Sequence, residues 1–192
     1  GTNPVQVCAY LKTAAGWADL TALTASSDHV CTAMSSGAGF NQFYAYAKPG
    51  TATEYFLIEN RQKTGRDASI AASGIAVWHA DELGDRDDQS LAYNSTHANY
   101  ELTLVQADNL WHFQSNSNSG DSNDLYFDGN TADGYGNELN DTTTPSARWW
   151  DGSGSDLNLS AFSAPGPTMT FRIQPLTLGV TAVTPSVAYS DS

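Results

Sequence analysis

The stretches YFLIE at residues 55–59 and GIAVWHA at residues 74–80 are short and almost continuously apolar. Runs of this kind predict central β-strands that are covered on both faces. Elsewhere apolar and polar side chains alternate with a period of two, in YELTL at 100–104, LNLSA at 157–161 and TMTFRI at 168–173. Clusters of Gly, Asn, Asp and Pro separate these runs. The pattern predicts an all-β fold, an antiparallel sandwich or jelly-roll-like domain.

The domain organisation follows from the length and from two segments that lack a clear strand pattern. A chain of 192 residues suits one domain. We expect a β-rich domain at 1–174, and residues 175–192 form a linker or the start of a following domain. The segment 114–148 is rich in Ser, Asn, Gly and Asp. Because so long a structureless loop is uncommon in a compact domain, we expect a bound cation to order it.

The charge balance excludes several classes of partner. The formal net charge is −13 and the sequence pI is about 4.3. A nucleic-acid-binding protein needs a basic face, and so does a protein that docks on anionic lipid. No apolar run approaches the ~20 residues of a membrane span. We therefore expect neither a nucleic-acid partner nor a membrane span.

An acidic loop is the first candidate for a ligand site. Carboxylates come from Asp121, Asp124 and Asp128, and Asn118 adds an amide oxygen. Calcium takes six to eight oxygen ligands of these types. The sequence therefore predicts a calcium site here; the alternative is a solvated loop whose Asp and Asn residues are good turn formers.

A weaker second candidate lies in the strand at 74–80 and beyond. At strand spacing, His79 and Asp81 share one face. Together with His97 they either bind a metal or form a structural hydrogen-bonded pair. Glu59 and Arg61 also share a face, and we expect them to form a structural ion pair.

The cysteines and tryptophans allow two further predictions. Cys8 and Cys31 are the two cysteines, both in strand-like runs. The low lysine content and the abundance of Thr and Asn favour an exported protein, so we predict that the two form a disulfide; the alternative is a pair of free thiols in a cytosolic protein. Trp149 and Trp150 are adjacent, so at most one can stack on a sugar and the other belongs to the core. The chain has no H-E-x-x-H zinc motif and no nucleophile elbow, so we expect no enzymatic activity from it.

Five segments resemble a known family in their order along the chain. They are EYFLIENRQKTGRD (54–67), SGIAVWHADE (73–82), YELTLVQADN (100–109), NSGDSND (118–124) and PGPTMTF (165–171). Together they resemble the region that follows the zinc-binding helix domain in secreted metalloproteases of the immune inhibitor A family. In this resemblance Asp121 and Asp124 match the family's acidic turn, and His79 and Asp81 match its W-H-x-D-E strand. No position matches the family's zinc ligands or catalytic glutamate.

The resemblance implies a β-rich region that packs against a zinc protease domain, with structural calcium and an extracellular bacterial location. We therefore expect a non-catalytic, calcium-binding accessory domain that supports the protease fold or the substrate groove. Its partner would be the catalytic domain, with a protein or glycan substrate. The alternative is a calcium-assisted carbohydrate-binding or adhesion module of a multidomain exoprotein.

Overall fold

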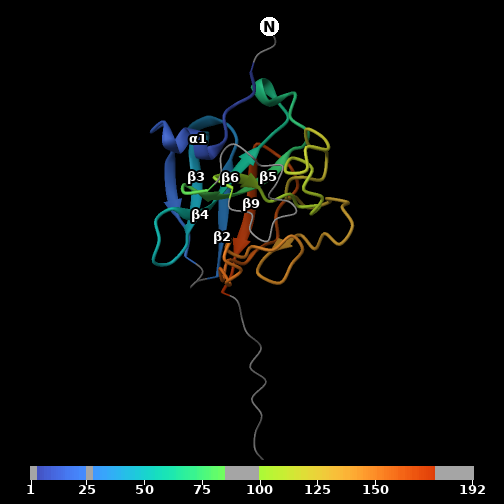
Figure 1. Cartoon of the computed structure of the whole chain (residues 1–192). Helices are drawn as coiled ribbons and strands as arrows, with labels where there is room; N and C mark the ends of the chain where they lie inside the picture. The colour runs from blue at the N-terminus through green and yellow to red at the C-terminus, as the bar shows by residue number, and fades with distance from the viewer. Residues whose placement is uncertain (1–3, 25–27, 85–99, 176–192) are drawn as a thin grey trace, which may run out of the picture.

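Two β-sheets form the frame of the protein in the computed structural model, which describes residues 4–24, 28–84 and 100–175 (Figure 1). The five strands of the first sheet lie in the order β1 (Asp19–Ala22), β3 (Gln42–Ala47), β4 (Glu54–Arg61), β5 (Gly74–Asp81) and β6 (Leu102–Leu104). The four strands of the second sheet lie in the order β2 (His29–Met34), β9 (Thr168–Ile173), β8 (Leu159–Ser160) and β7 (Glu138–Leu139). One short α-helix, α1 (Ala9–Ala14), and two 3₁₀ turns, η1 (Gly37–Gly39) and η2 (Gly65–Asp67), complete the described elements.

The strand pairing is antiparallel throughout the second sheet and in most of the first. β4 and β5 pair over their full length, with Glu54 opposite Asp81 and Arg61 opposite Gly74. The exception is β1, which runs parallel to β3. The prediction of an all-β antiparallel sandwich is confirmed, and β1 is the one departure from it among the described strands.

The apolar runs of β4 and β5 are explained by burial on two sides. Phe56 and Ile58 of β4 face the main core, which lies between the sheets and includes Phe171 of β9. Leu57 points the other way, against Ala9 of α1, in a smaller apolar cluster. A strand covered on both faces loses the alternation that marks a half-exposed strand.

The segment 114–148 contains one short strand, β7, and is held partly by apolar contacts. Tyr126 and Leu139 are buried in the main core. The backbone of Tyr126 also exchanges two hydrogen bonds of 2.9 Å with that of Ile75 in β5. Burial of these apolar side chains therefore helps to order the segment, for which a bound cation was expected from the sequence.

The predicted disulfide is wrong, since Cys8 and Cys31 are both free thiols. Cys31 lies in β2 and is buried in the core between the sheets. Cys8 caps the start of α1, beside Ala9, which packs on the outer face of the first sheet. The two thiols therefore belong to opposite sides of that sheet. The strand-like run VQVCAYL is misleading because its second half is helical.

The described residues include no helix with the length and apolar character that a membrane crossing requires. The C-terminal prediction for 175–192 concerns residues that, after position 175, lie outside the described part of the chain.

Candidate metal centre

Two loops that follow different parts of the fold meet at one side of the first sheet. The first continues from β6 through Gln106 to His112, and the second contains Asp121 and Asp124. The backbone N–H of Ala107 donates to the carbonyl oxygen of Asp124 at 2.9 Å. The Gln106 side-chain amide also donates to Asp124 Oδ1. These bonds fix the two loops against each other.

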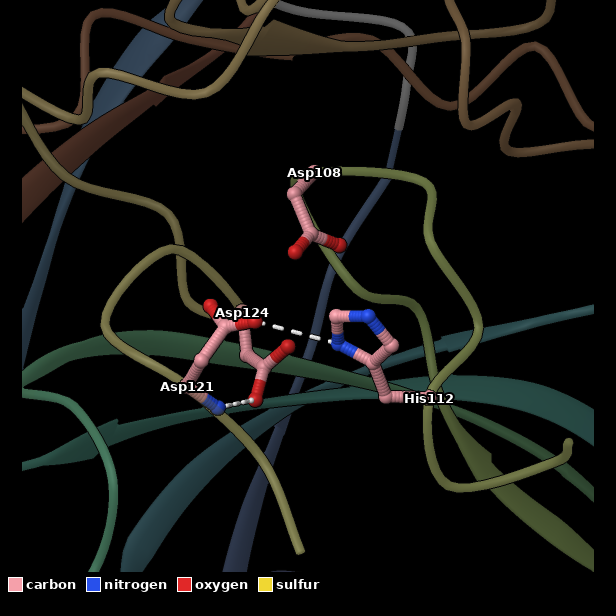
Figure 2. Close-up of side chains that lie close together, drawn as sticks. All are labelled: Asp108, His112, Asp121 and Asp124. Carbon is pink, nitrogen blue, oxygen red and sulfur yellow. Dashed lines mark hydrogen bonds and ion pairs between the residues drawn. The ribbon is translucent and has the colours of Figure 1, made fainter. Parts of the chain in front are cut away.

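Four side chains converge where the loops meet. Each of Asp108, His112, Asp121 and Asp124 offers a ligand atom within 4.8 Å of the others. Figure 2 shows Asp108 and His112 on one loop facing Asp121 and Asp124 on the other. His112 Nδ1 lies 3.0 Å from Asp121 Oδ2, and the Asp121 N–H donates to Asp124 Oδ2 at 2.7 Å. We call these four residues the acidic site.

An unusual backbone presents Asp108 and His112 to the acidic site. Asn109 and Trp111 both have positive φ angles, of 56° and 54°. A left-handed conformation is disfavoured for a bulky residue such as Trp. Two side-chain bonds support the turn: Trp111 Nε1 donates to Asn109 Oδ1 at 2.9 Å, and the Leu110 N–H donates to Asp108 Oδ1 at 3.0 Å. Residues held in such conformations often cluster at functional sites.

The charges of the acidic site are not balanced within the described part of the protein. Among the described residues, no lysine or arginine forms an ion pair with the three carboxylates of the site. The one basic side chain paired with them is that of His112, which lies beside Asp121. Burial raises the pKa of Asp124 to about 6, and the negative charges of Asp121 and Asp108 add to this effect. Hydrogen bonds from the Asp121 N–H and from Gln106 oppose the rise without cancelling it. The site therefore favours either a proton or a cation.

Buried polar atoms without partners surround the same site. Gln106 is 0% exposed and its Oε1 has no hydrogen-bond partner, although its amide group touches Asp124. Asp108 Oδ2 is also buried and unpartnered. Buried polar groups normally have partners, so these atoms indicate that a bound species belongs here.

The donor set fits a divalent cation. Carboxylate and amide oxygens are the ligands that calcium prefers. An imidazole nitrogen suits zinc and other transition metals better than calcium. In the structure His112 lies against Asp121, where it can orient that carboxylate without binding the ion itself. Three carboxylates then remain as an all-oxygen set, which favours calcium.

The structure brings together two of the four residues predicted for calcium. Asp121 and Asp124 belong to the acidic site, whereas Asp128 is exposed and lies outside it. Asn118 Oδ1 accepts a hydrogen bond from the Gly120 N–H at 2.6 Å and so stabilises the turn. Asp108 and His112 were not predicted from the sequence. One feature of the sequence could have indicated Asp108: it follows shortly after the predicted strand at 100–104, where a chain commonly turns.

His79 has structural partners in the described part of the chain. It is 3% exposed, its Nε2 lies 3.1 Å from Glu54 Oε1, and its ring stacks on Trp150 with centroids 4.2 Å apart. Burial lowers the pKa of His79, so the neutral ring donates its Nε2–H to Glu54. The Asp81 Oδ1 accepts from the Leu83 N–H at 3.0 Å. His97, the third residue of the weaker candidate site, lies outside the described residues.

The remaining sequence predictions concern packing. The ion pair of Glu59 and Arg61 is present, with 3.3 Å between Oε1 and Nη1. Trp149 is 3% exposed and packs in the core, as expected for one of the two tryptophans. Trp150 is half-buried and stacks on His79, so its ring face is partly occupied. The buried Trp149 therefore has no face open to a sugar, and one face of Trp150 is covered by His79.

The fold and the acidic site define the chain as an all-β sandwich domain with a candidate divalent-cation centre. Comparisons with protein-family models, with curated proteins and with solved structures found no match to it.

Proposed function

We propose that the chain is a non-catalytic, calcium-binding β-sandwich domain that supports a secreted, immune-inhibitor-A-like zinc metalloprotease. The observation that carries the calcium part is the acidic site. Its three carboxylates meet within 4.8 Å, and none pairs with a lysine or arginine of the described residues. Like charges gathered so closely repel each other, and a divalent cation removes that repulsion.

The cation would add a further link between two loops that hydrogen bonds to Asp124 already hold together. Asp108 belongs to the loop after β6, and Asp121 and Asp124 belong to the segment before β7. A ligand that binds only the folded state stabilises it by mass action. Calcium would therefore act as a structural crosslink in a domain whose two cysteines are free.

The protease part of the proposal is supported by the sequence resemblance. Its more specific segments, ENRQK and WHADE, fall in and after the central strands β4 and β5. In this proposal the domain is extracellular and bacterial, and its partner is the catalytic domain of the same protease. It would shape the substrate groove or support the protease fold.

Thermal unfolding with calcium or with EDTA tests the calcium part. We expect calcium at about 100 times its Kd to raise Tm by about 5 °C or more. Asp121→Asn should abolish the rise, because it removes one of three clustered carboxylates. Asp128→Asn is the matched control, since Asp128 lies in the same segment but outside the acidic site, and it should retain the full rise. Identical Tm values in calcium and in EDTA for the wild type would contradict the proposal.

A casein assay tests the assignment of a non-catalytic role. The purified chain should hydrolyse no casein in the presence of zinc and calcium. Proteolysis by this chain that disappears with a chelator would overturn the assignment.

A further inference from the structure

A cavity of about 300 Å³ opens next to the acidic site. For comparison, an engineered apolar cavity of about 150 Å³ takes up benzene, and small-molecule sites begin at about 300 Å³. The cavity therefore has room for one aromatic ring with a short linker. Its walls are mainly apolar, with contributions from Ala72, Ala76, Trp78, Leu104, Phe113 and Leu125.

Asp124 belongs to both the cavity and the acidic site. Gly120 packs closely against Asp124 and two other residues that line the cavity, Phe113 and Ala71. A Cβ atom at this position would lie 2.7 Å from Asp124 Oδ2 and 2.8 Å from Phe113 Cζ. It would also lie 3.3 Å from the Cβ of Ala71, which lines the cavity. Since Gly120 has a φ of +101°, a side chain there is disfavoured by the backbone as well.

The acidic site leaves room in the coordination of a bound cation. Calcium takes six to eight oxygen ligands. The oxygen donors of the site are three carboxylates. An oxygen from outside the protein can therefore bind the ion, and the apolar cavity beside it selects the group that carries this oxygen.

The cationic residue of the cavity is already engaged. The guanidinium of Arg61 lies 3.3 Å from Glu59 Oε1 and 2.9 Å from Asp67 Oδ2. It also donates to the carbonyl oxygen of Gln6 at 3.0 Å. An anionic ligand in the cavity therefore finds its positive partner in the bound cation.

We propose that the cavity and the acidic site together form one binding site for a carboxylate that carries a compact apolar group. The carboxylate completes the coordination of calcium, and the apolar group fills the cavity beside Trp78 and Phe113. This proposal rests on the proposed function, because calcium is the partner of the carboxylate. The ligand is either a small apolar acid or the free C-terminus of a peptide that ends in a bulky apolar residue.

Titration calorimetry with 3-phenylpropionate and with N-acetyl-phenylalanine tests the proposal. In calcium we expect at least one of them to bind, and in EDTA we expect a loss of affinity of about 10-fold or more. 3-Phenylpropanol lacks the carboxylate and acetate lacks the apolar group, so both should bind about 10-fold more weakly or worse. Preferential binding of N-acetyl-phenylalanine assigns the site to peptide C-termini, and preferential binding of 3-phenylpropionate assigns it to small acids.

Ala71→Leu narrows the cavity and should reduce binding of the preferred acid by about 10-fold while calcium affinity is retained. Ala68→Leu is the matched control: Ala68 is exposed and does not line the cavity, so this variant should bind like the wild type. If calcium binds but neither acid does, or if Ala71→Leu leaves acid binding unchanged, the inference is wrong and the proposed function stands. If calcium itself does not bind, both are wrong.

Discussion

Two carboxylate sites in this protein have opposite surroundings: the buried Glu54, and the acidic site, in which Asp124 is buried and Asp108 and Asp121 are partly exposed. Glu54 accepts from Lys48 Nζ at 2.5 Å, from the Trp150 N–H at 2.7 Å and from His79 Nε2 at 3.1 Å. In the acidic site, by contrast, Asp108 Oδ2 has no partner. The fold therefore supplies donors and a cation where a carboxylate is structural. In the acidic site, where we propose that a metal ion binds, the described residues provide fewer hydrogen-bond donors and no lysine or arginine.

The pKa values follow the same division. Burial alone would raise the pKa of Glu54, but hydrogen bonds from His79, Lys48 and the Trp150 N–H outweigh it and hold the value at about 2. Burial raises the pKa of Asp124 to about 6, since the donors there are too few. Substitutions in the two groups should consequently change stability in different directions when calcium is absent.

The largest effect is expected from Glu54→Ala in EDTA. This change leaves His79, Lys48 and the Trp150 N–H without their common acceptor. Removing one partner of a buried charged group costs about 3 to 5 kcal/mol of unfolding free energy. Urea unfolding measures the loss, with the exposed Asp133→Ala as the control, which should change the free energy by less than about 0.5 kcal/mol. A loss below about 1 kcal/mol for Glu54→Ala would show that the network is not structural.

Asp108→Asn should sharpen the contrast, because its effect depends on calcium. In EDTA it removes a negative charge that no described lysine or arginine balances, and the amide oxygen of Asn can still accept from the Leu110 N–H, so the free energy of unfolding should stay constant or rise by about 1 kcal/mol. In calcium at about 100 times the wild-type Kd, the variant should lose about half or more of the roughly 2.7 kcal/mol that binding contributes. Urea unfolding in both media measures this. The same loss of stability in EDTA and in calcium would mean that Asp108 is structural, like Glu54.

The pH dependence of stability should also separate the two groups. The native pKa of Asp124 lies above its ordinary value of 3.8, so the folded protein binds more protons than the unfolded chain between these values. In EDTA its contribution therefore falls as pH rises from about 4 to about 6, by at most about 3 kcal/mol. The contribution of Glu54 is present above its ordinary pKa of 4.5 and is lost as pH falls toward about 2.

Unfolding free energies from pH 3 to 8 check this expectation. In EDTA, Asp124→Asn should remove the decline between about pH 4 and 6. Calcium binding should weaken below about pH 6, because protons compete with calcium for the Asp124 carboxylate. A wild-type profile in EDTA that rises steadily through this range, unaltered by Asp124→Asn, would contradict the account of Asp124.

The smallest effect is expected from a reducing agent. Since Cys8 and Cys31 are free, dithiothreitol should shift Tm by less than about 1 °C with calcium or with EDTA. A fall of several degrees would show that a disulfide contributes to stability after all.

The strands with strong local patterns could be predicted from the sequence. The runs at 55–59, 74–80 and 168–173 correspond to β4, β5 and β9 because double burial or strict alternation marks each of them. The run at 157–161 yields only the two-residue β8, since Asp156 and Ala161 both have positive φ angles that interrupt an extended chain. The helix α1 was missed because its six residues are too few to show helical periodicity.

The candidate site was only half predictable. Asp121 and Asp124 are three positions apart, so their proximity can be read from the sequence. Asp108 and His112 reach them because the Ala107 N–H bonds to Asp124 and because Asn109 and Trp111 adopt left-handed conformations. Neither property follows from hydrophobic periodicity. Asp128 looked equivalent to its neighbours in sequence, yet the chain turns it outward to solvent.

Calorimetric titration of calcium into the chelator-treated protein tests the central claim most directly. Sequence reasoning favours Asp128 as a ligand and the structure favours Asp108, so the two variants Asp108→Asn and Asp128→Asn form a decisive pair. The account predicts one calcium per chain, retained in Asp128→Asn and weakened by about 10-fold or more in Asp108→Asn. No calcium binding by the wild type, or binding that Asp108→Asn leaves unchanged, would contradict it.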